Sequence, residues 1–121
     1  MINDENLSLK LFVILSRAAQ SITKRIEEDI KSYGLNPTEF VVLELLYNKG
    51  DQPIQKIGDK ILLASSSITY ASITPEGIEL MDTIFPKHKQ AIRQIFGGLD
   101  SGEKKVMIEQ LKKLGYYAQE L

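Results

Sequence analysis

The sequence predicts a mainly α-helical fold that contains a helix-turn-helix. Two observations carry this prediction. Apolar residues recur every three or four positions along two long stretches, at about residues 6–31 and 75–95, and this spacing is typical of amphipathic helices. Between these stretches, residues 53–70 have the pattern of a short amphipathic helix, a three-residue turn and a serine-capped helix start.

The first predicted helix covers about residues 6–31. Its apolar stripe is formed by Leu7, Leu11, Leu15, Ala18, Ile22, Ile26 and Ile30. A helix of this length exceeds what a small core can cover, so we expect part of the stripe to contact a second subunit. The alternative is a helix that lies across its own domain. The acidic run Glu27-Glu28-Asp29 is predicted to be a solvated face.

The second predicted helix begins after Gly34 and ends at Lys49-Gly50. Asn36 can cap its N-terminus, Pro37 suits the first helical position, and Glu39 completes a capping box. Local chemistry alone therefore specifies where this helix begins.

Pro53 is predicted to open the third helix, and a fourth helix should follow after a short connection. The inward face of the third helix is formed by Ile54, Ile57 and Ile61. Leu62-Leu63-Ala64 forms the connection, and Ser65 is a natural N-cap for the fourth helix. This order of elements is typical of a helix-turn-helix.

The C-terminal part is predicted to hold a short strand at Ala71–Ile73 and two more helices. Thr74-Pro75-Glu76 is a strong helix start, with a cap, a proline and an acidic residue in the first turn. The last helix begins where Asp100 and Glu103 have the spacing of a capping box. Its apolar residues are Met107, Leu111, Leu114, Ala118 and Leu121.

Composition and motifs argue against an enzyme. The chain has 121 residues, a formal net charge of -1 and no cysteine, which excludes disulfides, thiolate zinc sites and thiol-based redox sensing by this chain. His88, the only histidine, lies on an apolar stripe, which favours a packed or interface position over a catalytic or metal-binding one. No HExxH motif or glycine-rich phosphate loop occurs. We therefore expect no enzyme activity, metal or cofactor.

No apolar run is long enough to span a bilayer, and the acidic, polar N-terminus Met1–Asn6 is unlike a secretory signal. We therefore expect a cytoplasmic protein with no membrane partner.

The net charge of the chain weighs against binding to nucleic acid, because DNA-binding domains are usually basic on at least one face.

The start of the fourth helix is nevertheless the candidate DNA-reading element. A helix-turn-helix places the N-terminal part of its second helix against base edges. Small hydroxyl groups there permit close approach and can bind bases or phosphates. The candidate residues are Ser65, Ser66, Ser67, Thr69 and Tyr70. The alternative is a serine-rich helix cap, and the preceding helix and turn favour DNA binding.

Three segments together resemble a known family: Gly34–Gly50, Ile54–Tyr70 and Ala71–Met81. The last resembles a strand that leaves a wing, followed by the Thr-x-x-Gly start of a long dimerisation helix. Over nearly its whole length the chain resembles the MarR family of bacterial winged-helix transcriptional regulators. It is most similar to members that respond to phenolic or quinone-type compounds.

The resemblance implies a mainly α winged helix-turn-helix fold in a single domain that forms a homodimer. Residues 1–33 and 75–121 would supply the dimerisation helices, and residues 36–74 the DNA-binding lobe. The two lobes would bind successive major-groove turns of double-stranded DNA, with half-sites about 34–36 Å apart.

The resemblance also implies roles for single residues. Ser66, Ser67, Thr69 and Tyr70 would lie on the recognition helix, and Gln55 and Lys56 would lie where phosphate contacts are expected. A small-molecule effector would occupy a cavity between the dimerisation helices and the lobe. The aromatic candidates for that cavity are Phe12, Phe40 and Tyr47.

The chain departs from the family pattern between Tyr70 and Ala71. The pattern there contains the rest of the recognition helix and a strand–loop–strand wing rich in arginine. A helix of about six residues has fewer than two turns and cannot hold itself in a groove. Either the chain has lost its wing, or the sequence joins two residues that flank an omitted segment. Because every other cap and stripe is intact, we favour the second explanation, which requires a Tyr70–Ala71 Cα distance far above the roughly 3.8 Å of a trans peptide.

The sequence thus predicts a homodimeric transcriptional regulator, a repressor, that binds a near-palindromic operator and is released by a small-molecule or stress signal. The alternative is a wingless helical dimer that acts as a protein-interaction or ligand-binding module without DNA binding.

Overall fold

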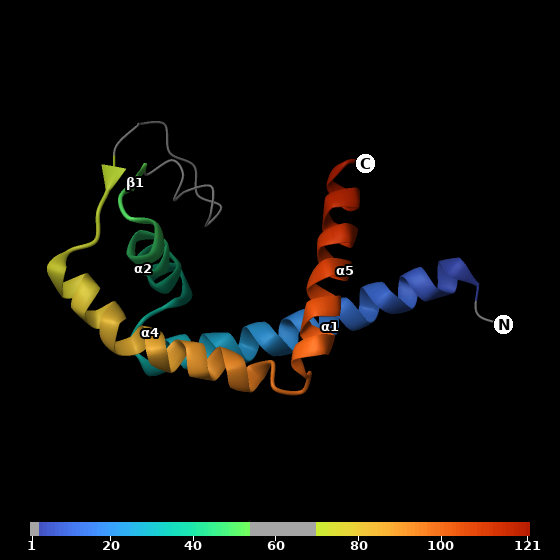
Figure 1. Cartoon of the computed structure of the whole chain (residues 1–121), viewed down its shortest axis with the longest axis horizontal. Coiled ribbons are helices and arrows are strands. Elements are labelled where there is room, and N and C mark those ends of the chain that lie inside the picture. Colours follow the sequence, from blue (N-terminus) through green and yellow to red (C-terminus); the bar gives the residue numbers. More distant parts are fainter. Residues whose placement is uncertain (1–2, 54–69) are drawn as a thin grey trace.

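The computed structural model describes residues 3–53 and 70–121, and these ranges hold four helices and two short strands. The N-terminal elements are α1 (Asp4–Ser32), α2 (Pro37–Lys49) and β1 (Gln52–Pro53). The C-terminal elements are β2 (Tyr70–Ala71), α4 (Pro75–Ile95) and α5 (Ser101–Gln119) (Figure 1). The mainly α-helical fold class is confirmed. No helix in the described ranges is long and apolar enough to cross a membrane.

The molecule is elongated, with two ends of different character (Figure 1). The C-terminal half of α1 packs against α4, and α2 packs against both of these helices. The β1–β2 pair lies at the α2 end, whereas the N-terminal half of α1 extends past α5 at the other end (Figure 1). The DNA-binding lobe predicted at residues 36–74 and the N-terminus of α1 therefore lie at opposite ends of the chain.

Three predicted helix caps are confirmed, and the fourth, at Ser65, lies outside the described residues. The Asn36 side chain accepts a hydrogen bond from the Glu39 backbone N–H at 2.8 Å, and the Glu39 carboxylate accepts one from the Asn36 N–H at 3.0 Å. Asp100 and Glu103 form the same reciprocal pair at the start of α5. The Thr74 hydroxyl accepts from the Gly77 N–H at 3.0 Å and caps α4.

The main apolar core joins α1, α2 and α4. It is formed by Ile30 of α1, Phe40 of α2, and Met81 and Ile84 of α4. A smaller cluster contains Leu45 and Leu46 of α2, and the half-buried Ile73 packs against both clusters. Ile73 therefore links the chain that leaves β2 to the rest of the core.

Four predictions around the short strands are wrong. Pro53 does not open a helix, because it lies in β1 opposite Tyr70. Tyr70 does not lie on a recognition helix, because it is the first residue of β2, and the strand predicted at Ala71–Ile73 is Tyr70–Ala71. The expected chain break is also absent, since Tyr70 and Ala71 are consecutive residues of one strand paired to β1. Backbone pairing between residues far apart in the sequence determines this region, and helix-start chemistry does not reveal such pairing.

Candidate nucleic-acid interface

An antiparallel strand pair holds the two ends of the predicted DNA-reading segment together. Gln52 pairs with Ala71 and Pro53 pairs with Tyr70, so residues 54–69 leave and rejoin the scaffold at the same place. The predicted third helix and the start of the fourth lie outside the described residues. The same holds for the candidate DNA contacts Gln55, Lys56, Ser65, Ser66, Ser67 and Thr69. Their roles stay predictions, as does a DNA contact by Tyr70.

The chain that leaves β2 is anchored to α4 by a close contact at Gly77. A Cβ atom built on Gly77 would lie 2.8 Å from Cγ1 of Ile73 and 3.3 Å from the Thr74 hydroxyl oxygen. The Thr-x-x-Gly pattern therefore has a packing reason: glycine at this position leaves room for the Ile73 side chain against the first turn of α4.

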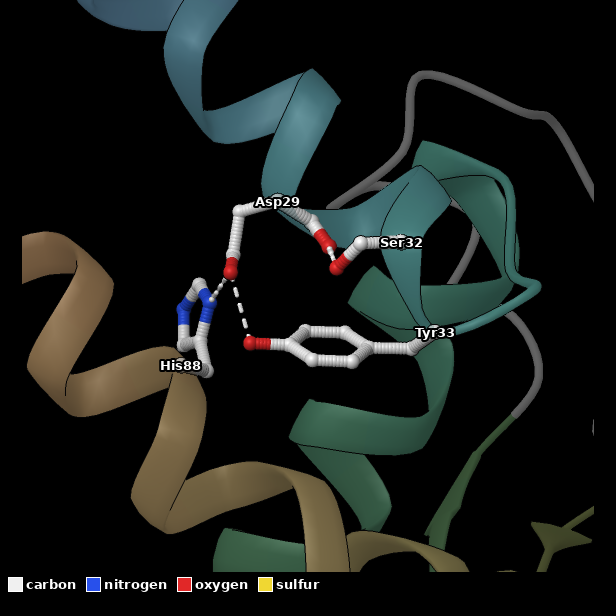
Figure 2. A network of polar contacts seen from close by, with 4 residues as sticks. All are labelled: Asp29, Ser32, Tyr33 and His88. Atoms are coloured by element: carbon white, nitrogen blue, oxygen red, sulfur yellow. Dashed lines mark hydrogen bonds and ion pairs between the residues drawn. The ribbon is translucent and has the colours of Figure 1, made fainter.

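A polar junction connects α1 and α4 beside the core (Figure 2). The Asp29 carboxylate uses both oxygens: Oδ1 accepts from the Tyr33 hydroxyl at 2.6 Å, and Oδ2 lies 2.8 Å from Nδ1 of His88. The Asp29 and His88 side chains are only 12% and 11% exposed. The prediction that Asp29 belongs to a solvated acidic face is therefore wrong, whereas the packed position predicted for His88 is confirmed.

The His88 ring extends this junction to α2. Its centroid lies 4.5 Å from that of Phe40 and 6.3 Å from that of Phe85, with both ring pairs tilted. Phe40 itself is 2% exposed and belongs to the core. His88 thus contacts residues from the two other helices that meet at this point. The spacing of Asp29 and Tyr33, one helical turn apart on α1, is the only local sign of this junction in the sequence.

Two tyrosines in this region have altered acidity. Burial raises the pKa of the Tyr33 phenol, and the hydrogen bond to Asp29 and the charge of its carboxylate raise it further. The hydrogen bond to Asp82 raises the pKa of Tyr47, with smaller contributions from burial and from the Asp82 charge. Both phenols therefore remain protonated donors to carboxylates over a wider pH range than a free tyrosine.

The structure does not bring the three effector candidates into one cavity. Phe12 lies on the N-terminal half of α1 and is 67% exposed, whereas Phe40 is packed in the core. Tyr47 is half-buried on α2, donates to Asp82 of α4 and packs against Phe85, with ring centroids 5.6 Å apart. An effector role for these residues stays a prediction. In the described ranges, no group of three His, Cys, Asp or Glu side chains could hold a metal ion.

An apolar groove runs between the N-terminal half of α1 and α5. Its volume is about 1040 Å³, and its walls include Leu11, Leu15, Val106, Leu111 and Leu114. Helix α5 has no buried residue, and Val106 and Tyr117 on it are more than half exposed. In a single chain these two helices therefore leave a large apolar surface open to solvent.

Within the described residues, an antiparallel strand pair and α2 are joined to long helices with an open apolar groove, and this arrangement agrees with the mainly α winged helix-turn-helix class predicted from the sequence. The model of the MarR family matches residues 35–81. The HTH-type transcriptional regulator MhqR of Bacillus subtilis (strain 168) is 45% identical over 137 residues, which cover 93% of this chain and 94% of that protein. The uncharacterized HTH-type regulator YkoM of the same organism is 34% identical, covering 98% and 94%. The chain belongs to the MarR family.

Solved structures agree on the fold. The MarR family transcriptional regulator AbsC from Streptomyces coelicolor superposes with a TM-score of 0.78 at 14% identity, covering 100% of this chain and 99% of AbsC. Overoxidized AbfR bound to DNA gives a TM-score of 0.64 at 17% identity, covering 94% and 96%. At these identities the likeness concerns the fold alone.

The two curated relatives contain residues that this chain lacks. Both alignments, of 137 and 145 residues, are longer than the chain's own 121 residues. Positions of each relative therefore have no counterpart here.

Proposed function

We propose that this MarR-family chain is a homodimeric transcriptional repressor that binds a near-palindromic operator. One observation carries the proposal: the helices joined to the predicted DNA-binding lobe leave an apolar groove between α1 and α5 that the described residues do not cover. The curated relatives support it, because both are named as helix-turn-helix transcriptional regulators. A solved structure with the same fold is described as bound to DNA.

The proposed dimer contact is the groove between α1 and α5. A second copy related by a two-fold axis would place its own α1 and α5 there, since a two-fold interface uses the same surface on both chains. Exposed apolar side chains on α1, including Leu7, Leu11 and Leu15, would then be covered. Two lobes carried at the far ends of the dimer would bind two half-sites of one operator.

The proposed release signal is a small molecule or a stress signal, with a phenolic or quinone-type compound as the first class to test. A ligand can release the repressor only if it binds the free form better than the DNA-bound form. Because the sequence contains no cysteine, direct thiol oxidation is not the proposed signal. The proposal implies a cytoplasmic protein without enzyme activity.

Selection of duplexes from a random pool tests the proposal. Bound duplexes should share a near-palindrome, and the affinity for them should fall steeply as salt rises, because phosphate contacts release counterions. Failure of the folded, dimeric protein to enrich any duplex would favour the wingless interaction module.

A charge placed in the groove tests the dimer. Leu114 lines the groove, so Leu114→Glu should give particles with the mass of one chain in sedimentation experiments. Lys105→Glu is the control, because it places the same carboxylate on α5 at an exposed position outside the groove. Dimers of unchanged affinity in Leu114→Glu would exclude this surface.

A further inference from the structure

The junction of Asp29, Tyr33 and His88 lies where the dimerisation helices meet the lobe (Figure 2). Asp29 and Tyr33 belong to α1, and His88 belongs to α4. The His88 ring packs against Phe40, which lies in the first turns of α2, the first helix of the lobe. One carboxylate and one imidazole therefore connect all three helices.

We infer that Asp29 and His88 are positioning residues that set the angle of the DNA-binding lobe on α1 and α4. Through this angle they determine the spacing at which two lobes of a dimer meet DNA. The spacing part of the inference rests on the proposed function, whereas the angle is a property of a single chain.

The geometry of the junction indicates that it fixes the orientation of α4 relative to α1. Apolar contacts between Ile30, Met81 and Ile84 hold the helices together, but burial of apolar surface has no preferred direction. A hydrogen bond weakens steeply when it bends, so the 2.8 Å contact between Asp29 and His88 restricts rotation of α4 about α1.

The carboxylate is itself held in place. Tyr33, one turn further along α1, donates to the other Asp29 oxygen at 2.6 Å and so fixes the Asp29 rotamer. His88 is held on one side by Asp29 and on another by the Phe40 ring. Both side chains of the contact are thus fixed in orientation, so the contact resists sliding of α4 along α1.

Stability alone would not require this pair. Replacing both partners of a buried hydrogen bond by apolar groups of the same shape can be nearly neutral or stabilising, because no polar group is then left unpaired. A less restricted orientation of the helices should therefore be measurable in a variant whose free energy of unfolding is unchanged.

Distances between spin labels test the inference. The sequence has no cysteine, so Lys24→Cys on α1 and Lys49→Cys at the end of α2 place two labels at exposed positions. Dilution with unlabelled protein restricts the measured distances to labels in one chain. The unaltered junction should give one narrow distribution, and Asp29→Ala, which removes both contacts of the carboxylate, should broaden it.

The decisive variant is Asp29→Leu with His88→Leu, which should unfold near the temperature of the unaltered protein yet give a broad distribution. His88→Asn should keep the distribution narrow, because its amide can donate to Asp29 from the position of Nδ1. The control is Arg25→Gln, which removes an exposed 3.1 Å ion pair with Glu28 inside α1 and should change nothing.

Unchanged narrow distributions in both Asp29→Ala and the double-leucine variant would overturn the inference. If the double-leucine variant fails to fold, Asp29→Ala alone decides. If His88→Asn broadens the distribution as much as the double variant, a directional bond is not the cause.

Binding to duplexes of altered half-site separation gives the second measurement. Asp29→Ala should lose roughly tenfold in affinity for the best spacing while tolerating other spacings better. A merely structural defect would weaken binding to every spacing equally. If the unaltered protein binds no duplex, the proposed function fails, while the label distances still decide whether Asp29 and His88 set the angle.

Discussion

Replacing Gly77 by alanine tests how the DNA-binding lobe is attached to α4. The new Cβ would lie 2.8 Å from Cγ1 of Ile73, which is closer than two carbon atoms can approach without strain. Ile73 packs against both apolar clusters, so moving its side chain away from α4 changes its packing against them. The substitution therefore forces a change in the core that joins the lobe to α4.

Two effects of this substitution oppose each other. Alanine is favoured over glycine inside a helix by about 1 kcal/mol. Overpacking of a filled core costs about 1–3 kcal/mol. The steric cost should prevail, giving a net loss of about 1 kcal/mol in the free energy of unfolding, or about 4 °C in melting temperature for a domain of this size.

Thermal unfolding at one fixed protein concentration measures this loss, because the melting temperature of a dimer depends on concentration. Gly115→Ala is the matched control: nothing lies within 4 Å of the new Cβ, so only the gain in helix propensity remains. In the background of Ile73→Ala, Gly77→Ala should cost less, since the atom it meets is gone. An equal cost in both backgrounds, or a stabilising Gly77→Ala, would refute the reasoning.

Three further predictions concern the core, a cap and a phenol. Met81→Ala should lower the free energy of unfolding by about 2–5 kcal/mol in urea titrations, because Met81 is fully buried. Thr74→Ala should cost about 1 kcal/mol in the same titrations through loss of the α4 cap. The raised pKa of Tyr33 means that its contribution to stability is present below the usual tyrosine value and is lost as pH rises towards the folded-state value. Tyr33→Phe should therefore flatten the fall in stability above about pH 10, and an unchanged slope in alkaline unfolding curves would contradict the assignment.

The helix starts that were predicted correctly depend on capping residues that lie close together in the sequence. Asn36 with Glu39, Asp100 with Glu103, and Thr74 before Pro75 each specify a helix start within four residues, and the structure confirms all three. Their hydrogen bonds need no partner from elsewhere in the chain. Such caps are visible in the sequence because the donor and acceptor lie close together along it.

Contacts between distant residues explain the failures. Pro53 and Tyr70 have the residue types of a helix start and a helix interior, but their backbones pair with each other as strands. Asp29 stands in an acidic run that favours solvent, yet its partner His88 lies 59 residues further along. Neither contact leaves a periodic signal, so only the folded chain reveals the junction between α1 and α4.

The β1–β2 pair has a consequence for how this protein can change over time. It brings Pro53 and Tyr70 to neighbouring positions, roughly 4.5–5.5 Å apart at Cα in an antiparallel ladder. Because both ends of residues 54–69 are fixed in one strand pair, this segment begins and ends at the same place on the scaffold formed by α1, α2 and α4. Under the proposed function, the residues that would read the operator are separate from those that line the groove between α1 and α5, so substitutions in one set need not alter the other.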